Sequence, residues 1–296
     1  PDTPKSALGL GRVPRMGSYQ GFVFGSFAHA GPSLLEHLGA AREAIDRLVR
    51  LSPLGRVELT AGWLHHEVRA NWKMLVENET DGYHPQFVHA SIFEVGDSHV
   101  AEVYSERSAA TARDLGGGHT EHDLRAHFRR MDRPLAWFGT TEDRLPDYCR
   151  AMREAYGAEK AREILVEGSP HIMVFPNLFI AEIQIFVIQP LAVDRTVQHV
   201  TPLQLAGAPD MNRRLLHQAS GSVGPAGFLL ADDSEMYERN QRGVVAREPE
   251  WLILRRGLNR ERVDADGHLA GAATDETTQR GIWRHIRAML TEEVPA

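Results

Sequence analysis

Residues 171–205 are predicted to form consecutive strands, and this block restricts the fold classes that the chain can adopt. The segments HIMVFPNLFIAEIQIFVIQP and RTVQHVTPLQL are rich in β-branched and aromatic residues. Pro176–Asn177 breaks the first segment, LAVDRT makes a turn before the second, and Glu182–Ile185 alternates between polar and apolar residues. Helix-forming blocks lie on both sides. Consecutive strands flanked by helices predict an α+β fold with an antiparallel sheet rather than a repeated βαβ unit.

The remaining elements are predicted from shorter patterns. Residues 18–27 are predicted as one strand. Ser33 and Glu36 have capping-box spacing and precede an apolar helical pattern that runs to Leu51. The middle of the chain, from 98 to 168, favours helices. A strand leading into a helix is predicted over 56–72, and further helices over 210–220, 225–241 (ending before Gly243) and 274–290.

The segment ENETDGYHPQFVH, residues 77–89, carries an unusual set of polar side chains. A helix would place Asp81 beside His84, three residues on, whereas His84 and His89 would lie about 140° apart around an ideal helix. Pro85 disfavours helical dihedral angles at His84 and is a good first residue for a new helix. A kink there would let both imidazoles converge on one metal ion. The alternative is a solvated helix in which Asp81 and His84 form a surface hydrogen bond.

A metal site needs a third ligand, and the best distant candidate is Asp233 in GPAGFLLADDSEMYERNQ. Its helical neighbours are apolar, so a buried carboxylate here would need a compensating partner. The neighbouring Asp232 has Glu235 and Arg239 on its side of the helix, which predicts a wetter position with an ion pair. Two histidines and one carboxylate form the facial triad of non-haem Fe(II) oxygenases. A capping or salt-bridged acid is the alternative for Asp233.

Two segments together, NWKMLVENETDGYHPQFVH and GPAGFLLADDSEMYERNQRG, resemble the catalytic α subunit of Rieske-type aromatic ring-hydroxylating dioxygenases. SYQGFVFGSF, HIMVFPN and TDETTQRGIWRH match further landmarks in the same order, and the resemblance covers residues 15–292. It implies a curved antiparallel sheet gripping a long helix, the helix-grip fold of Bet v 1 and START domains. It also implies a homotrimer or an α3β3 assembly.

The resemblance also implies roles for individual residues. His84, His89 and Asp233 would be the Fe(II) ligands. Asp81 would hydrogen-bond His84 and relay electrons from a neighbouring subunit's Rieske cluster, and Asn78 would line the pocket near the iron. The other pocket candidates each have an ordinary structural alternative: a strand-start histidine bonded to backbone for His171, and plain core packing for Phe93, Val223 and Leu229.

The implied reaction is the Fe(II)- and O2-dependent dihydroxylation of an aromatic substrate to a cis-dihydrodiol. The spacing E-N-x-x-D-G-Y-H is more similar to benzoate-type than to naphthalene-type members, which hints at a carboxylated arene. Ring monooxygenation within the same family is one alternative. A metal-free helix-grip module that binds a hydrophobic ligand is another, and a hydrolytic zinc enzyme is a third.

One departure from the family pattern is large. The family's α subunit begins with a Rieske domain, whose [2Fe–2S] cluster needs two cysteines and two histidines, and this chain has the single cysteine Cys149. We therefore expect residues 1–17 to be a tail or linker that follows an absent Rieske domain, and 18–296 to form the non-haem iron catalytic domain. The cluster would lie on a missing domain or a partner. Electrons would come from a ferredoxin and a separate reductase that binds NAD(P)H, because the chain has no dinucleotide fingerprint.

The other histidines and the overall charge bear on whether a second metal site exists and on which partners the protein binds. His119, His122 and His127 in GGGHTEHDLRAH are expected in a solvated flexible loop rather than in a second metal cluster. His65 and His66 are adjacent on a predicted strand and would point to opposite faces. A net charge of −7 argues against nucleic acid or an anionic membrane as the main partner. With no apolar run of membrane-spanning length, a cytoplasmic protein is expected.

Overall fold

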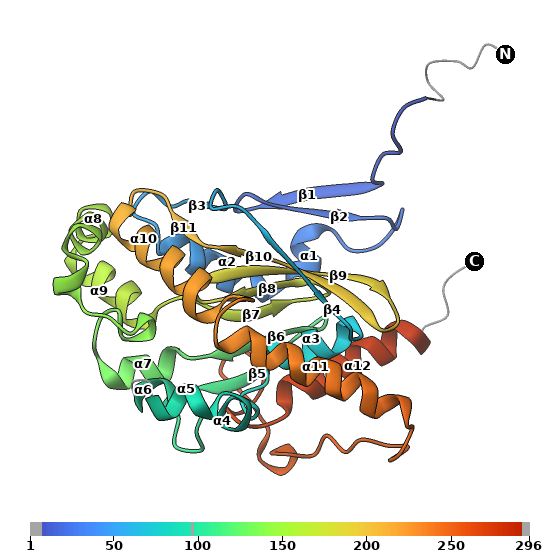
Figure 1. The fold of residues 1–296 in the computed structure, drawn as a ribbon. Helices are drawn as coiled ribbons and strands as arrows, with labels where there is room; N and C mark the ends of the chain where they lie inside the picture. Colours follow the sequence, from blue (N-terminus) through green and yellow to red (C-terminus); the bar gives the residue numbers. More distant parts are fainter. Residues whose placement is uncertain (1–7, 96–97, 292–296) are drawn as a thin grey trace.

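The computed structural model describes residues 8–95 and 98–291. Within these residues, nine strands form one antiparallel sheet (Figure 1). Their order across the sheet is β12 (Arg262–Val263), β13 (Leu269–Ala272), β5 (Thr111–Gly116), β6 (His119–Asp123), β7 (His171–Val174), β8 (Leu178–Ala181), β9 (Gln184–Ala192), β10 (Arg195–Pro202) and β4 (Leu64–Val68). Two short antiparallel pairs lie outside it, β1 (Arg15–Tyr19) with β2 (Phe22–Ser26), and β3 (Val57–Glu58) with β11 (Gln204–Leu205).

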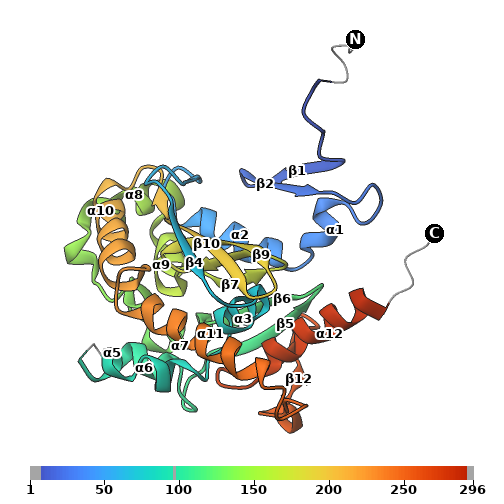
Figure 2. The same cartoon turned by 45° about the vertical axis from the view of Figure 1, so that its right-hand side comes forward.

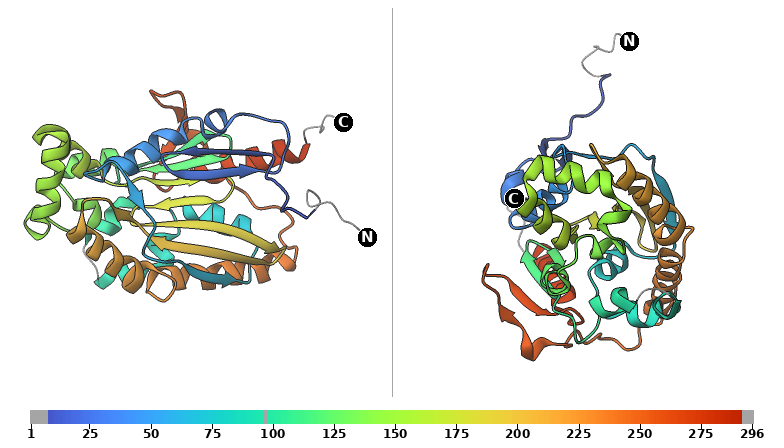
Figure 3. Two further views of the ribbon diagram at one scale, coloured as in Figure 1. Left: turned by 90° about the horizontal axis from the view of Figure 1, so that it is seen from above. Right: turned by 90° about the vertical axis from the view of Figure 1, so that its left-hand side faces the viewer.

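Helices cover the sheet and close one of its ends. Before the strand block they are α1 (Leu34–Leu38), α2 (Ala41–Arg50), α3 (Trp72–Glu79), α4 (Pro85–Val88), α5 (Ala90–Val95), α6 (Ser98–Val103), α7 (Arg125–Met131), α8 (Pro146–Tyr156) and α9 (Ala158–Glu167). After it come α10 (Pro209–Gln218), α11 (Leu229–Val245) and α12 (Thr277–Thr291). Short 3-10 turns span Ala136–Phe138, Glu142–Arg144 and Leu258–Arg260, and a π-helical turn spans Ala219–Val223. Figure 3 shows α8, α9 and α10 grouped at one end of the sheet.

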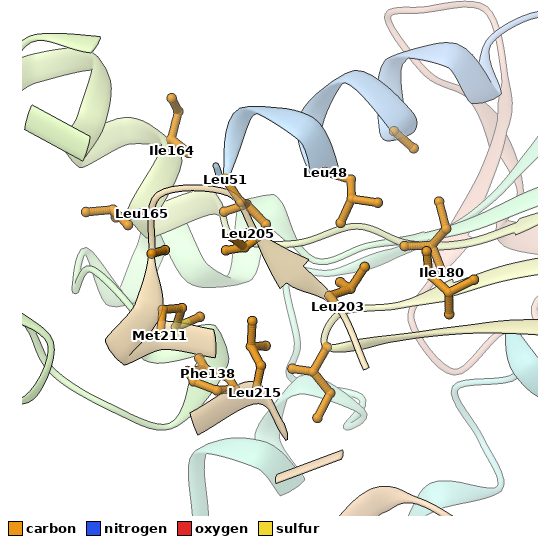
Figure 4. Packing of buried hydrophobic residues seen from close by; sticks show 14 of the residues in the cluster. Leu48, Leu51, Phe138, Ile164, Leu165, Ile180, Leu203, Leu205, Met211 and Leu215 are labelled. Atoms are coloured by element: carbon orange, nitrogen blue, oxygen red, sulfur yellow. The ribbon is translucent and has the colours of Figure 1, made fainter. Parts of the chain in front are cut away.

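Both faces of the central strands are buried, and alternate residues belong to different cores. In β7, Ile172 and Val174 belong to one apolar cluster, whereas Met173 between them belongs to another. The first cluster lies between the sheet and α2, α8, α9 and α10; Figure 4 shows Leu48 of α2 and Leu215 of α10 within it. Because both faces are covered, these strands read as nearly continuous apolar runs in the sequence.

The second cluster lies between the other face of the sheet and the helices α3, α11 and α12. α12 contacts β5 and β6, and α3 contacts β7, β8 and β9. Figure 2 shows the sheet curving around α3. This arrangement confirms the predicted α+β fold with a curved antiparallel sheet and flanking helices.

Two predicted elements near the N-terminus are interrupted in the structure. Residues 18–27 are not one strand, because β1 and β2 form a hairpin that turns at Gln20–Gly21, where both residues have positive φ. The helical pattern that runs to Leu51 is split at Gly39, whose φ of 46° ends α1. The capping box of Ser33 and Glu36 forms as predicted. Local turns therefore divided segments whose apolar patterns looked continuous.

The later segments differ from prediction in similar ways. The alternating stretch Glu182–Ile185 contains a turn, since Glu182 has a φ of 36° and separates β8 from β9. The helix predicted over 225–241 begins at Leu229 and continues through Gly243 to Val245.

The glycine run before the three histidines is the turn of a buried hairpin. Gly116, Gly117 and Gly118 all have positive φ, which glycine adopts without strain, and they join β5 to β6. His119 and His122 on β6 are 2% and 1% exposed. The predicted solvated loop is wrong, because β6 is an interior strand between β5 and β7.

Candidate metal centre

The bend that carries the two motif histidines lies between α3 and α4. The carboxylate of Asp81 accepts hydrogen bonds from the backbone N–H groups of Tyr83 (2.9 Å) and His84 (3.2 Å). Pro85 begins α4, as predicted. However, His84 has the helical dihedral angles that Pro85 was expected to disfavour, φ −60° and ψ −34°, so the kink predicted at His84–Pro85 is wrong in its position. The helix is broken earlier, at Thr80, with φ −121° and ψ 27°.

This bend packs directly against the sheet. A Cβ atom added to Gly82 would lie 2.0 Å from the carbonyl oxygen of Ala273 and 2.4 Å from Cε1 of His122. Both of those residues are buried. Only glycine allows this close approach, and the approach holds the position of the neighbouring ligand residues.

Asp233 approaches this bend from α11, which contacts both α3 and α4. Its Oδ1 atom lies 3.5 Å from Nε2 of His84 and 3.3 Å from Nε2 of His89. The three ligand atoms lie within 4.8 Å of one another. Asp233 is 4% exposed and His89 is 2% exposed. The structure thus brings together the three side chains that the sequence pattern singled out.

A second carboxylate faces the other ring nitrogen of each histidine. Nδ1 of His84 lies 3.2 Å from Asp81 Oδ2, within hydrogen-bond distance. Nδ1 of His89 lies 3.6 Å from Asp232 Oδ2, beyond that distance, and has no hydrogen-bond partner. Asp232 is partly exposed, and the ion pair expected beside it forms between Arg239 and Glu235.

The arrangement fits Fe(II) in its donor chemistry. Two imidazole nitrogens and one carboxylate oxygen converge, which is the donor set of the facial triad. Ligand histidines usually have a carboxylate or carbonyl at their second nitrogen, and both His84 and His89 have an acid there. Within residues 8–95 and 98–291, His119, His122 and His127 do not form a second metal-binding group.

In the metal-free protein, a proton on His84 compensates the negative charges of Asp233 and Asp81. Burial lowers the pKa of His84, but hydrogen bonds to Asp233 and Asp81 outweigh it and raise the pKa to about 9. Burial raises the pKa of Asp233, but hydrogen bonds to His84 and His89 outweigh it and lower the pKa to about 2. Burial also opposes ionisation of Asp81, yet the hydrogen bond and charge of His84 hold its pKa below the usual 3.8. A metal ion must displace the proton of His84.

The metal-free chain should lose stability as the pH rises from about 6.5 through about 9. The pKa of His84 is higher in the folded chain than in the unfolded one. Protonated His84 therefore adds to the free energy of unfolding, fully below pH 6.5, and this stabilisation disappears as His84 deprotonates. The loss is on the order of 3 kcal/mol. Urea unfolding in a chelator between about pH 6 and about pH 9.5 measures it. An identical pH dependence in His84→Gln would contradict the assignment.

Two residues of α3 extend the site. Asn78 Nδ2 donates to Tyr237 Oη (3.0 Å) and to Asp233 Oδ1 (3.3 Å), so it lies beside the triad as expected. Glu79 is buried and accepts a hydrogen bond from Gln198 Nε2 (2.8 Å). Burial and the nearby charge of Asp233 raise the pKa of Glu79 well above 4.5. Sequence reasoning missed Glu79, because its burial follows only from the packing of α3.

A cavity of about 710 Å³ opens beside the triad, within the usual size range of small-molecule sites. Four predicted pocket residues line it, namely His171, Phe93, Val223 and Leu229. Much of the remaining wall is aromatic, with Phe128, Trp137, Phe138, Phe179 and Phe186. An aromatic ring would therefore find an apolar environment next to the triad.

His171 combines the two interpretations of its sequence position. It lines the cavity and also begins β7, where Nε2 donates to the backbone oxygen of Glu79 (2.6 Å). Its Nδ1 lies 2.9 Å from Glu182 Oε1. Burial lowers the pKa of His171, but the charge and hydrogen bond of Glu182 outweigh it and raise the pKa above 6.5.

Several residues of the cavity wall were not anticipated from the sequence. Glu182 has a positive φ, and a non-glycine residue in this region often marks a functional site. Gln184 is 2% exposed, and its Oε1 atom has no hydrogen-bond partner. A polar residue within an apolar strand is the one sequence sign that could have marked Gln184.

Over residues 57–292, the chain matches the family model described as ring hydroxylating alpha subunit, catalytic domain. The chain belongs to this family. The assignment made from the two motifs is thus confirmed, and the region that matches contains the whole of the triad.

Curated relatives of this ring-hydroxylating α-subunit domain are dioxygenase subunits. The large subunit of 2-halobenzoate 1,2-dioxygenase from Burkholderia cepacia is 27% identical over 266 residues, covering 84% of this chain and 54% of the relative. Toluate 1,2-dioxygenase subunit alpha from Pseudomonas putida is 29% identical over 241 residues, covering 80% and 52%. The chain thus spans about half the length of these relatives.

Solved structures support the fold of the domain. Naphthalene 1,2-dioxygenase with indole bound in the active site matches 98% of this chain and 67% of its own, with a TM-score of 0.78 and 23% identity. The enzyme from Rhodococcus sp. bound to indole has a TM-score of 0.76 and 21% identity, over 99% and 70%. At this identity the likeness confirms the expected catalytic-domain fold alone. In the described part of the chain, no helix is long and apolar enough to cross a membrane.

Proposed function

We propose that this chain is the iron-holding catalytic domain of an aromatic ring-hydroxylating dioxygenase. His84, His89 and Asp233 would hold Fe(II), which when bound would activate dioxygen for insertion of both oxygen atoms into an aromatic ring. The observation that carries the proposal is the convergence of these three ligand atoms, within 4.8 Å, on the wall of an aromatic-lined cavity. Three protein ligands leave the other coordination positions open to dioxygen and substrate.

The chain's own residues would position the ring and keep water away from it. Phe179 and Phe186 lie with their ring centroids 5.5 Å apart on the cavity wall, and Phe179 packs edge-on against His171 at 5.0 Å. Such faces favour offset or edge-on contact with an aromatic substrate. Asn78 would hold the ligand carboxylate of Asp233 in place through its hydrogen bond.

Asp81 would orient His84 and receive electrons. Its carboxylate faces Nδ1 of His84, which leaves Nε2 directed at Asp233. We propose that the electrons come from a Rieske [2Fe–2S] cluster on another domain or a neighbouring subunit. A ferredoxin and an NAD(P)H-dependent reductase would supply the cluster. A homotrimer or α3β3 assembly in the cytoplasm would place the cluster beside Asp81.

The proposed substrate is an arene that carries a carboxylate. Both the 2-halobenzoate and the toluate dioxygenase subunits are named for aromatic carboxylates, and the motif spacing is similar to that of benzoate-type members. The reaction consumes one arene, one O2, two electrons and two protons, and gives one cis-dihydrodiol.

The proposal is tested by metal content and by the fate of the oxygen atoms. The purified chain, loaded with Fe(II) under anaerobic conditions, should hold about one iron per chain. With toluate, chemically reduced Rieske ferredoxin and 18O2, mass spectrometry should detect a diol with two 18O atoms. A single 18O atom would indicate a monooxygenase. A well-folded chain that takes up no Fe(II) would indicate a metal-free binding module.

Asp81→Asn should separate metal binding from turnover. Asparagine has the size of aspartate but lacks the negative charge that faces His84, so product formed per reduced ferredoxin should fall by 10- to 100-fold, roughly the effect of losing a partner that orients a ligand. Iron content should remain close to one per chain. Glu94→Gln, an exposed change outside the cavity wall, is the control. Undiminished turnover in Asp81→Asn would contradict its role in electron entry.

A further inference from the structure

The charged residues on the cavity wall away from the metal centre differ in how far a neighbouring charge compensates them. Glu182 lies 2.9 Å from Nδ1 of His171. Asp143 and Arg144 are adjacent and exposed, and the positive charge of Arg144 favours the ionised carboxylate of Asp143. Arg133 also lines the cavity and is an exposed residue, and its guanidinium forms no hydrogen bond or ion pair with any residue that the structure describes. One positive charge on this wall therefore has no counter-charge.

A buried hydroxyl without a partner lies on the same cavity wall as Arg133. Thr140 lines the same cavity, is 8% exposed, and its Oγ1 atom has no hydrogen-bond partner. Leaving such a group unpaired is costly unless a ligand completes it. The hydroxyl rotates about a single bond, so it can turn toward an acceptor that enters the cavity.

Backbone hydrogen bonds hold the turn that separates these two residues. The backbone N–H of Ala136 donates to the carbonyl of Arg133 (3.3 Å), and that of Thr140 donates to the carbonyl of Leu135 (3.3 Å). Leu135 is itself held by a hydrogen bond to Leu165 of α9 (2.8 Å). Arg133 and Thr140 therefore flank one anchored turn, and each offers a donor to an anion.

We propose that Arg133 and Thr140 form the subsite that binds the carboxylate of an aromatic substrate. This inference rests on the proposed function, since it orients the ring of that substrate within the cavity that also contains the triad. A guanidinium matches a planar carboxylate, and the threonine hydroxyl adds a third donor. Glu182 is paired with His171 and Asp143 lies beside Arg144, so Arg133 is available to attract an anion on this wall.

The test compares two probes of nearly the same shape, benzoate and neutral benzamide. Their dissociation constants are measured by titration calorimetry on the full chain, both metal-free and loaded with Fe(II) without oxygen. The wild type should prefer benzoate. Arg133→Gln should weaken benzoate binding about tenfold and leave benzamide within about twofold, since a charged hydrogen bond of this kind contributes about that much. Arg133→Lys should recover part of the loss.

Further variants distinguish a binding role from a structural one. Thr140→Val should weaken benzoate about threefold with little effect on benzamide. Arg130→Gln is the matched control, because Arg130 is an exposed arginine on α7 outside the cavity wall. Equal losses for both probes in Arg133→Gln, no loss for either, or a wild type without a benzoate preference would overturn the subsite. Failure to bind iron would refute the proposed function but not the carboxylate subsite, because the preference for benzoate is also measured in the metal-free chain.

Discussion

Asp233→Ala is expected to abolish stoichiometric iron binding, with iron content falling from about one per chain to near zero. The carboxylate is the one ligand that α11 contributes, and both histidine Nε2 atoms face it at 3.3 to 3.5 Å. Loss of a direct ligand should exceed the effect of losing an orienting partner, so affinity should fall by more than about 100-fold. Elemental analysis after anaerobic loading and desalting gives the stoichiometry.

The control for this experiment lies two residues further along α11, on another side of the helix. Glu235 bonds Arg239 on the exposed side of the helix, so Glu235→Gln should keep the wild-type iron content. Circular dichroism and thermal unfolding of Asp233→Ala in chelator would show whether the chain remains folded. A folded Asp233→Ala chain that still holds one iron would rule out Asp233 as a ligand.

Gly82→Ala is expected to cause the largest loss of stability from a single methyl group near the site. The new Cβ would overlap the backbone oxygen of Ala273 and the ring of His122, neither of which can move without disturbing the buried hairpin. The cost should be about 3 kcal/mol or more, which for a domain of this size lowers the melting temperature by roughly 6 to 10 °C. Because Gly82 lies between Asp81 and His84, iron affinity should fall as well.

Gly243→Ala is the matched comparison, since Gly243 lies in α11 with no atom near the position of its Cβ. Alanine there should be neutral or stabilising by up to about 1 kcal/mol, because it is the better helix former. Differential scanning calorimetry of both variants in chelator separates packing from metal binding. Equal melting temperatures for Gly82→Ala and the wild type would show that the close approach to Ala273 is absent in solution.

Local sequence was sufficient for the elements whose patterns agree with their neighbours. The strand block from His171 onward, the capping box at Ser33 and the helix start at Pro85 are set by residues close together in the chain, and all three form as predicted. The residues brought together at the metal centre were also predicted, because a resemblance over two motifs linked Asp233 to His84 and His89 across a long separation.

Contacts between distant segments decided the rest. The sequence around His119 and His122 has glycines and charges typical of a solvated loop, yet pairing with β5 and β7 makes it an interior strand. Glycines with positive φ form hairpins as readily as loops, so the local pattern could not decide between them. The same holds for the turn at Glu182, whose strained φ no neighbouring residue indicates.

The sequence by itself thus determined the fold class, because apolar periodicity depends on neighbouring residues, and its two motifs identified the side chains of the candidate metal site. Only the tertiary structure decided which other polar groups face the cavity. Arg133 and Thr140 look like ordinary loop residues in the sequence. In the described part of the fold, Arg133 lacks a counter-charge and the hydroxyl of Thr140 lacks a hydrogen bond, which makes both candidates for binding a ligand. Both properties depend on every segment packed around these residues.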